Sequence, residues 1–530
     1  MQDPEITPSI VIFLLGTAAF LPLLFLAVFL WHRYYRDDPG NTARRVVKNS
    51  AVPGVIRIII RAMDMAFALV LYRWLEADAV GQYDFAIVLV VQYFATIADF
   101  GLGTLLTREV ARRPDDAAKY FSNTLLLRWG LSLLMIPAAL LLIGTYDGLS
   151  TFVDGSQPLS GDGATAILIL CLTLFPAAYN NVVTALFNAR EQMEIPAAVE
   201  LVTQIVSVFA RLAAVLLGFG VIGLAWAAVV TTTLTSIILL LLQMRVLFKP
   251  QLQWDWSFAR GLFRPAFPLL LNSILVNIAF TFDIFILRAV ESSEAIAQYR
   301  MPYRVINVVL ILAPLLTNAI FPLLSRYAEQ DRQAFQRAYR LTMQMLLLAA
   351  FPIAVGATVL ATDMVILFTG DESANYAGVS DYALAILIWF LPLSYVNGVI
   401  QYVLIALNRQ QAITRAFIVM AIFNLLANLI AIPVFGIFGA SVVTVLTEVV
   451  LYMAFLPLLR REQVVPPLLS LSWRPVLAAL GMGGVMVLVY PMGWLLAAIA
   501  APLVYAIVLW LLGTFGEEER ALVLRVLGRS

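Results

Sequence analysis

The sequence predicts an all-α polytopic membrane protein, and three observations support this fold class. Of its 530 residues, 62% are hydrophobic and 13% are charged, whereas a soluble chain is about half apolar and roughly a quarter charged. Apolar runs long enough to cross a bilayer as helices recur along the whole chain. Cationic residues gather in every second loop between these runs, as the positive-inside rule expects. A soluble globular fold is therefore excluded.

The apolar runs predict fifteen transmembrane helices. The first run, 9–31, follows the acidic residues Asp3 and Glu5 and is too long for the apolar core of a cleaved signal peptide. We therefore expect an N-terminal anchor there. The other fourteen predicted spans are 50–73, 83–107, 120–144, 164–188, 197–219, 221–244, 265–288, 299–325, 340–361, 380–407, 412–435, 437–459, 474–490 and 493–513.

The loop charges predict the orientation of these spans. One set of alternate loops holds 26 of the 34 lysines and arginines, and the other set holds acidic residues such as Asp147 and Asp363. Because cationic loops stay in the cytoplasm, we expect the N-terminus outside and the C-terminus inside.

An internal repeat predicts the domain organisation. A shift of 216 to 220 residues aligns Gly81-Gln82-Tyr83 with Ala297-Gln298-Tyr299, and also brings the basic loops 108–119 and 326–340 into register. We expect two six-helix lobes, 48–247 and 248–460, related by a pseudo-twofold axis along the membrane normal. An anchor with a basic cytoplasmic linker (1–47) precedes them, and a transmembrane helical pair with a cytoplasmic tail (461–530) follows.

Composition also excludes several kinds of chemistry. With one cysteine, Cys171, and one histidine, His32, the chain lacks the usual ligands of a zinc or haem site. None of its three lysines follows a glycine-rich phosphate-binding loop. The net charge of +1 gives no indication of a nucleic-acid partner. We therefore predict no catalytic residue, no metal and no cofactor.

Charged residues inside the first lobe's predicted spans are candidates for function, because an intramembrane charge usually faces a cavity or a partner. Arg57, Arg61 and Asp64 share one helix face, and Arg211 lies deep in a later span. Arginine suits phosphate because its planar fork donates paired hydrogen bonds. Alternatively, Arg61 pairs with Asp64 while Arg57 snorkels to the interface. A pair of Arg211 with Glu200 or Asp64 is also open.

The second predicted lobe adds further charged residues. Arg300 and Arg304 lie one turn apart near the end of a span, and either line the cavity or snorkel outward. Asp283 and Glu448, like Asp64, are candidates for proton or sodium coupling or for charge partners of nearby arginines.

Two sequence motifs suggest a family. Asp99-Phe100-Gly101-Leu102 ends one span and is followed by Arg108 in a basic loop, and turns with Asn188 and Asn408 follow corresponding spans of the two lobes. With the two-lobe pattern, these motifs resemble the Wzx-type polysaccharide-export flippases, which are related to lipid II flippases and to multidrug and toxin extruders. The resemblance gives Asp99, Gly101, Arg108, Asn188 and Asn408 structural roles.

The resemblance implies a transporter and not an enzyme. Such a flippase would move undecaprenyl-pyrophosphate-linked oligosaccharide from the cytoplasmic to the outer leaflet of a bacterial or archaeal plasma membrane by alternating access. Its expected partners are this polyprenyl-linked glycan, membrane lipids, and the polymerase and glycosyltransferases of a surface polysaccharide such as O-antigen. A lipid II or multidrug exporter of the same superfamily is the alternative. A membrane glycosyltransferase that uses Glu76 and Asp78 is a weaker one.

Overall fold

The computed structural model describes residues 42–152, 157–159 and 161–514, and every regular element in these residues is a helix. The predicted anchor at 9–31 lies outside the described residues. The all-helical membrane fold is confirmed, since twelve described helices are long and apolar enough to cross a membrane.

This count differs from the fifteen predicted spans for identifiable reasons. The helix that covers the predicted span 50–73 carries Arg57, Arg61 and Asp64, and it is not among the twelve. The predicted spans 412–435 and 437–459 are two helices that meet at Gly436, whose φ of 55° is non-helical, and they count as one because they join end to end as Gln410–Arg461. The predicted first span is not described.

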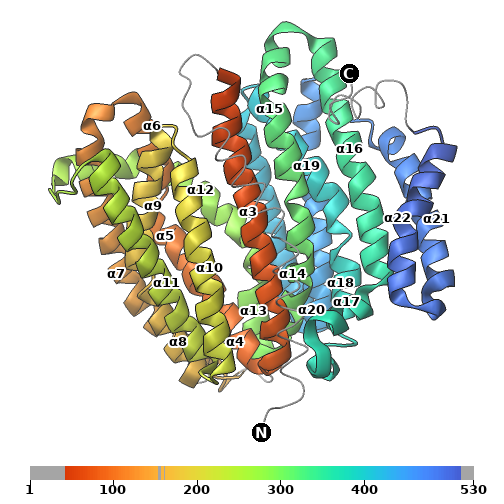
Figure 1. Cartoon of the computed structure of the whole chain (residues 1–530), viewed down its shortest axis with the longest axis horizontal. Helices are drawn as coiled ribbons and strands as arrows, with labels where there is room; N and C mark the ends of the chain where they lie inside the picture. Colours follow the sequence, from red (N-terminus) through yellow and green to blue (C-terminus); the bar gives the residue numbers. More distant parts are fainter. Residues whose placement is uncertain (1–41, 153–156, 160, 515–530) are drawn as a thin grey trace. The chain divides into compact units, whose positions relative to one another are not determined.

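The chain forms two compact units. Unit 1 runs through the described residues to Val308 and includes Phe368–Asn375 and Asn428–Gly436. Its main helices, shown in Figure 1, are α3 (Thr42–Trp74), α4 (Ala77–Ile87), η1 (Val88–Phe94), α5 (Ala95–Asp99), α6 (Leu102–Arg112), α7 (Ala117–Leu149), α8 (Gly161–Cys171), α9 (Leu174–Ala189), α10 (Glu194–Leu216), α11 (Gly220–Leu242), η3 (Gln243–Leu247), α12 (Trp256–Thr281), α13 (Asp283–Val290) and α14 (Ser293–Leu310).

Within unit 1, close helix packing brings distant parts of the sequence together. Helix α10 packs against α3 and α11, and α12 packs against α5, α6 and α7. At Gly81 in α4, a Cβ atom would overlap the carbonyl oxygen of Ser293, the first residue of α14. Asn277 in α12 donates hydrogen bonds to the Gln92 carbonyl (3.3 Å) and to Oγ1 of Thr96 (3.0 Å). Small residues and polar side chains thus join these helices, as in other membrane bundles.

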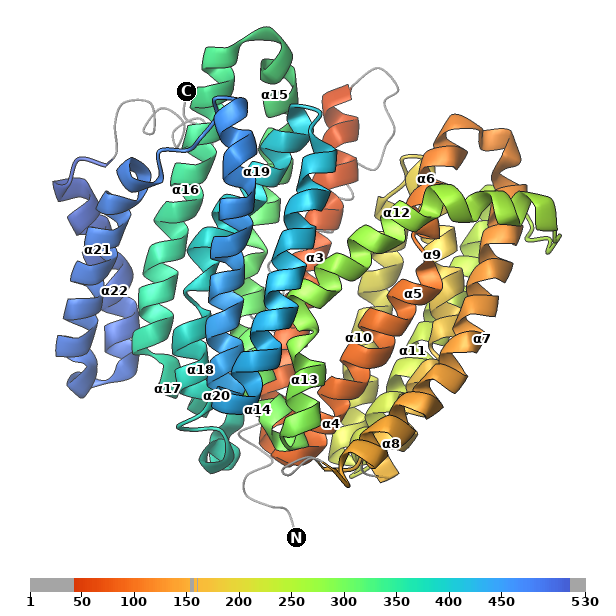
Figure 2. The ribbon, with the colours of Figure 1, turned by 180° about the vertical axis from the view of Figure 1, so that it is seen from behind.

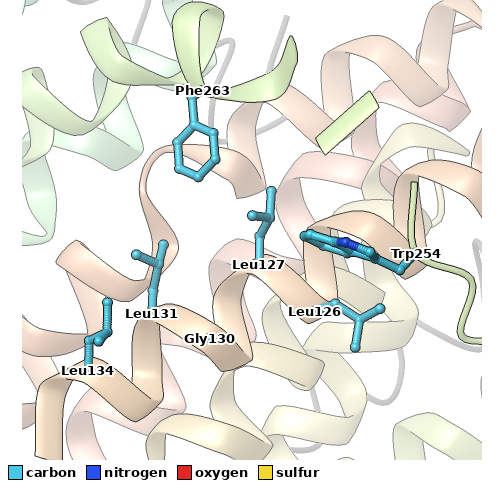
Figure 3. A pocket seen from close by; sticks show the side chains of 7 residues that line it. All are labelled: Leu126, Leu127, Gly130, Leu131, Leu134, Trp254 and Phe263. Atoms are coloured by element: carbon cyan, nitrogen blue, oxygen red, sulfur yellow. The ribbon is translucent and has the colours of Figure 1, made fainter. Parts of the chain in front are cut away.

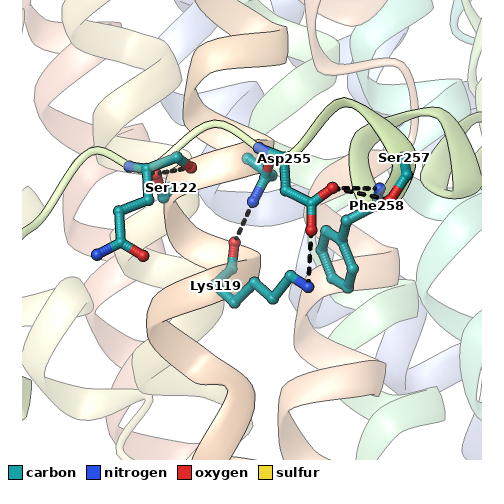
Figure 4. Close-up of polar contacts among 7 residues, drawn as sticks. Lys119, Ser122, Asp255, Ser257 and Phe258 are labelled. Carbon is teal, nitrogen blue, oxygen red and sulfur yellow. Dashed lines mark hydrogen bonds and ion pairs between the residues drawn. The ribbon is translucent and has the colours of Figure 1, made fainter.

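The segment before α12 is attached to α7 by polar contacts (Figure 4). Nζ of Lys119 lies 2.9 Å from Oδ2 of Asp255. Oδ1 of Asp255 accepts the backbone N–H of Phe258 at 3.1 Å and so caps the start of α12. Ser122 and Asn123 of α7 bond to the backbone of Gln253 and Asp255. The entry to α12 is therefore fixed by polar contacts to α7.

Unit 2 contains a helical bundle with its own apolar core. In this unit, α16 packs against α15, α19, α21 and α22, and Figure 2 shows α21 and α22 side by side. Buried Ala478, Met482 and Ala501 belong to the core, and the Tyr505 hydroxyl donates to the Leu348 carbonyl at 2.8 Å. The elements are α15 (Leu312–Gln330), α16 (Arg332–Val359), α17 (Ala361–Thr369), α18 (Ser380–Leu387), α19 (Phe390–Ala406), α20 (Gln410–Arg461, in part), α21 (Leu468–Val489) and α22 (Trp494–Leu511).

The units are defined by internal contacts, whereas the predicted lobes 48–247 and 248–460 rest on the sequence repeat. The lobes and their pseudo-twofold axis stay a prediction.

Candidate functional site

Unit 1 contains a charged cavity of about 200 Å³. Four helices contribute to it: α3, α4, α10 and α14. Four of the lining residues are arginines and two are aspartates, so their formal charge is +2. The lining consists of Arg61, Asp64, Met65, Tyr83, Asp84, Ile87, Arg211, Arg300, Arg304, Asn307 and Val308.

Helix α3 presents Arg61 and Asp64 to the cavity, because positions three apart share a helix face. The side chain of Arg57, one turn before Arg61, is exposed and does not line the cavity. The sequence predicted that Arg57, Arg61 and Asp64 share one helix face, but only Arg61 and Asp64 line the cavity.

Asp64 connects α3 to α10 through two interactions. Its Oδ1 lies 3.1 Å from Nη2 of Arg211 and accepts a hydrogen bond of 2.8 Å from Nε2 of Gln204. The Arg211 guanidinium also lies 4.5 Å from the centre of the Phe67 ring, a cation–π distance. Of the partners considered for Arg211, the structure shows Asp64. Arg211 is thus held at the cavity by a carboxylate and an aromatic face.

Asp84 makes the corresponding connection between α4 and α14. Its Oδ1 lies 2.5 Å from Nη2 of Arg304, and its Oδ2 accepts a hydrogen bond of 3.2 Å from the Tyr72 hydroxyl. Only 1% of Asp84 is exposed, so the pair is protected from solvent screening. Sequence reasoning missed Asp84. Asp84 and Arg304 are 220 residues apart, and no local sequence pattern connects them.

Arg300 completes the cationic lining. Its guanidinium lies 5.9 Å from the centre of the Tyr303 ring, and its Nε is buried without a hydrogen-bond partner in the described residues. Together with Arg304, it lines the same cavity as Arg61 and Arg211. The structure thus brings four of the five predicted phosphate-binding arginines to one site.

The two other candidate coupling carboxylates lie elsewhere. Asp283, at the start of α13, is buried and accepts a hydrogen bond from the Tyr299 hydroxyl. Glu448 in α20 is also buried, and its Oε2 accepts a 2.6 Å hydrogen bond from Nδ2 of Asn397. Neither residue lines the charged cavity. Their role in ion coupling stays a prediction.

The predicted motif around Asp99 forms a break between α5 and α6. Phe100 and Gly101 have positive φ values of 51° and 73°, which a glycine adopts without strain. The Asp99 carboxylate accepts the backbone N–H groups of Gly101 (3.1 Å) and Gly103 (3.3 Å) and pairs with the buried Arg128. A Cβ atom on Gly101 would lie 2.7 Å from the Ala266 carbonyl oxygen in α12. Sequence reasoning assigned no partner to Arg128.

The other motif residues lie at the surface or at helix ends. Arg108 in α6 pairs with its neighbour Glu109 at 3.0 Å, and its side chain is about half exposed. Asn188 lies near the end of α9, where its carbonyl oxygen accepts the N–H of Glu191. Asn408 follows α19 with a φ of 57°. Asparagine tolerates this left-handed conformation better than most residues.

Comparison with known proteins places this architecture in a family. Residues 46–328, more than half of the chain, match the family model described as "Polysaccharide biosynthesis protein", and residues 268–430 match the MatE model. The chain is 25% identical over 166 residues to a protein of Haloferax volcanii named "Probable low-salt glycan biosynthesis flippase Agl15". That match spans about a third of each chain, namely 31% of this one and 34% of the relative.

Solved structures share the fold. The lipid II flippase MurJ in an inward closed conformation matches with a TM-score of 0.71, at 14% identity, over 87% of this chain and 98% of MurJ. An inward-facing MATE multidrug transporter matches with a TM-score of 0.58, at 16% identity, over 78% and 98% of the two chains. A MOP superfamily transporter from Pyrococcus furiosus matches with a TM-score of 0.55, at 16% identity, over 82% and 97%.

The fold, the family match and these relatives agree with the resemblance seen in the sequence. The chain belongs to the polysaccharide biosynthesis protein family, and it shares its fold with the solved MurJ and MATE structures.

Proposed function

We propose that this protein flips a polyprenyl-pyrophosphate-linked oligosaccharide, with undecaprenyl as the expected lipid, from the cytoplasmic to the outer leaflet of a bacterial or archaeal plasma membrane. Family membership and the name of the Haloferax volcanii relative support a lipid-linked glycan as the substrate. The observation that carries the proposal is the cavity with four arginines and a formal charge of +2. Positive loops on one side support an N-terminus outside and a C-terminus in the cytoplasm.

In this proposal, the arginines bind the diphosphate of the substrate. Arginine stays charged when partly desolvated and donates bidentate hydrogen bonds to phosphate oxygens. Asp64 and Asp84 orient Arg211 and Arg304, while Arg61 and Arg300 supply the cationic charge that these carboxylates do not offset. Where burial lowers the local dielectric, as around Asp84, such interactions are stronger than at a surface. The diphosphate would thus be recognised independently of the attached sugars.

The charge of the cavity also separates this proposal from the multidrug alternative. An exporter of cationic drugs would be expected to present carboxylates and aromatic faces in excess, whereas arginines outnumber aspartates at this site. A lipid II exporter would use the same diphosphate chemistry, so only the sugar distinguishes it. Alternating access and coupling to protons or sodium through Asp64, Asp283 or Glu448 are further parts of the proposal. A polysaccharide polymerase and glycosyltransferases are its proposed partners.

A reconstituted flipping assay tests the function. Vesicles containing the full-length protein receive a fluorescent polyprenyl-pyrophosphate oligosaccharide, and a membrane-impermeant reagent measures how much label changes leaflet. We expect flipping by the wild type and at least a tenfold loss for Arg304→Ala and Arg211→Ala, because about 1.4 kcal/mol of lost binding corresponds to a factor of ten.

Arg112→Ala is the control, since 68% of that side chain is exposed on α6. Absence of flipping by a correctly folded wild type would refute the proposed function. Undiminished flipping by both cavity variants would refute the role of the arginines. Transport of a fluorescent organic cation in place of the glycan lipid would favour the multidrug alternative.

A further inference from the structure

A second cavity, of about 570 Å³, lies in unit 1 and is apolar (Figure 3). One wall is formed by α7, through Leu126, Leu127, Leu131 and Leu134. The opposite side consists of Trp254, which precedes α12, and Phe263 within α12. None of the helices that line the charged cavity contributes to it.

Gly130 makes room for this cavity. It lies in the middle of α7, between the leucines, and is exposed. A Cβ atom added at Gly130 would meet no other atom within 4 Å. Glycine costs about 0.5 to 1 kcal/mol relative to alanine inside a helix, and here neither a turn nor a close helix contact requires it. The side of α7 that faces the cavity is therefore open at this residue.

The surroundings indicate what chemistry fills the space. Both α7 and α12 are candidate membrane spans, so the cavity opens toward hydrocarbon, and an unfilled apolar void would lose dispersion contacts. Trp254 and Trp256 are both exposed at the start of α12. Tryptophan at this position is typical of the level of the lipid headgroups. A hydrocarbon chain that enters here would therefore have its polar end near the start of α12.

Two cations stand at that end of α12. Arg260 and Arg264 are exposed, and neither forms an ion pair or hydrogen bond in the part of the chain that is described. Arg260 precedes Phe263 by three residues and shares its helix face, and Arg264 is one turn after Arg260. The nearby Lys119 is already paired with Asp255 (Figure 4). The two arginines are thus placed to receive an anionic headgroup.

We propose that the cavity between α7 and α12 binds one acyl chain of an anionic glycerophospholipid of the surrounding bilayer, with its phosphate held by Arg260 and Arg264. The occupant is a membrane lipid rather than the polyprenyl chain of the transport substrate, because the proposed diphosphate site is built from other helices. The site is independent of the proposed flipping function.

Fluorescence quenching by brominated lipids tests the proposal. The full-length protein is reconstituted in phosphatidylcholine vesicles that contain either phosphatidylglycerol or phosphatidylcholine with dibrominated acyl chains. The chain has ten tryptophans, so the contribution of Trp254 is taken as the difference between each protein and its Trp254→Phe form. We expect stronger quenching of Trp254 by brominated phosphatidylglycerol than by brominated phosphatidylcholine at equal mole fraction.

Variants test whether the preference of Trp254 quenching for phosphatidylglycerol arises from the cavity. Gly130→Leu extends a side chain into the space from a Cβ position that meets no atom within 4 Å, and it should abolish the preference. Leu131→Phe provides a second way to fill the space. The matched control is Gly144→Leu, at an exposed glycine of the same helix that also has no atom within 4 Å of an added Cβ. Arg260→Gln and Arg264→Gln should each lower the preference for phosphatidylglycerol about fivefold, since one cation near an anionic surface contributes about 1 kcal/mol.

Three results would overturn the proposal. The first is equal quenching of Trp254 by the two brominated lipids. The second is an unchanged preference in both cavity-filling variants, when melting curves show that they are folded. The third is displacement of brominated phosphatidylglycerol by an equal mole fraction of undecaprenyl phosphate, which would assign the cavity to a polyprenyl chain.

Discussion

Asp84 and Arg304 are 220 residues apart in sequence and form an ion pair of 2.5 Å at the charged cavity. When Gly81-Gln82-Tyr83 is aligned with Ala297-Gln298-Tyr299, Asp84 falls on Arg300, so Asp84 pairs with the arginine one turn beyond its repeat equivalent. One partner comes from α4 and the other from α14, which also touch where Gly81 meets Ser293. The pair therefore links the two predicted repeats at the site where we expect the diphosphate to bind.

The first prediction concerns the stability of this pair. Asp84→Ala leaves Arg304 without its carboxylate and should lower the free energy of unfolding by about 2 to 4 kcal/mol. The double variant Asp84→Ala/Arg304→Ala should lose less than the sum of the two single variants, because neither charge is then left unpaired. Thermal unfolding in detergent ranks the stability of the wild type, the two single variants and the double variant.

Glu109→Ala is the control for this experiment. Its partner Arg108 has a side chain that is 48% exposed, so loss of that pair should change stability by less than about 1 kcal/mol. Additive effects of the two cavity substitutions would show that Asp84 and Arg304 are not coupled.

The second prediction separates two neighbouring arginines of α3. Both side chains are exposed, but only Arg61 lines the charged cavity. Arg61→Ala should therefore reduce flipping of the glycan lipid at least tenfold, and Arg57→Ala should reduce it less than twofold. The reconstituted assay compares initial rates at equal protein content. Equal losses in the two variants would mean that the charge of the whole helix face matters, as the sequence alone suggested, and not the cavity lining.

The third prediction concerns the break between α5 and α6. Gly101→Ala should lower the free energy of unfolding by at least about 2 kcal/mol, because alanine is strained at a φ of 73° and its Cβ meets the α12 backbone. Thermal unfolding measures the loss. Gly144→Ala, on the open face of α7, should be neutral or slightly stabilising. A wild-type melting temperature for Gly101→Ala would show that the break relaxes without cost.

The fourth prediction concerns pH. Hydrogen bonds from the Lys119 ammonium, the Phe258 N–H and the Ser257 hydroxyl hold the pKa of Asp255 well below its ordinary value of 3.8. Because the folded-state pKa is depressed, the stabilisation is fully present above pH 3.8 and is lost as the pH falls toward the folded-state value. The difference in melting temperature between wild type and Asp255→Asn should therefore be constant from pH 5 to pH 8.

The difference in melting temperature between wild type and Asp255→Asn should shrink below pH 3.8. Fluorescence of Trp254 and Trp256, which flank Asp255, provides a local readout of the contact between Lys119 and Asp255. A difference that grows on acidification would contradict the assigned sign.

Hydropathy predicted most of the fold because the length and apolarity of a span are local properties. The helical pair at the C-terminus and the spans of the described region follow from this pattern. Helix α3 shows its limit, since its three intramembrane charges keep it out of the set of apolar spans, although it supplies Arg61 and Asp64. The break at Gly436 was anticipated only as a boundary between two predicted spans.

Only the part of the candidate site that depends on local sequence was predicted. Helical spacing places Arg61 and Asp64 on one face, but it does not identify Arg211 as the partner of Asp64, because that contact depends on how α10 packs against α3. Asp84 stands among apolar residues with no charged neighbour one turn away. Its ion pair with Arg304 can be identified only when α14 is placed beside α4. The apolar cavity likewise depends on Gly130 facing a tryptophan that is 124 positions further along the chain.

The modest charge of the cavity has a consequence for the transport step. A diphosphate diester carries one negative charge on each of its two phosphates at neutral pH, and the lining carries a formal charge of +2. Protein and substrate headgroup would therefore form an electroneutral complex. Moving net charge through a low-dielectric membrane costs several kcal/mol, so the balance set by Asp64 and Asp84 would let the loaded protein change its access side without that electrostatic barrier.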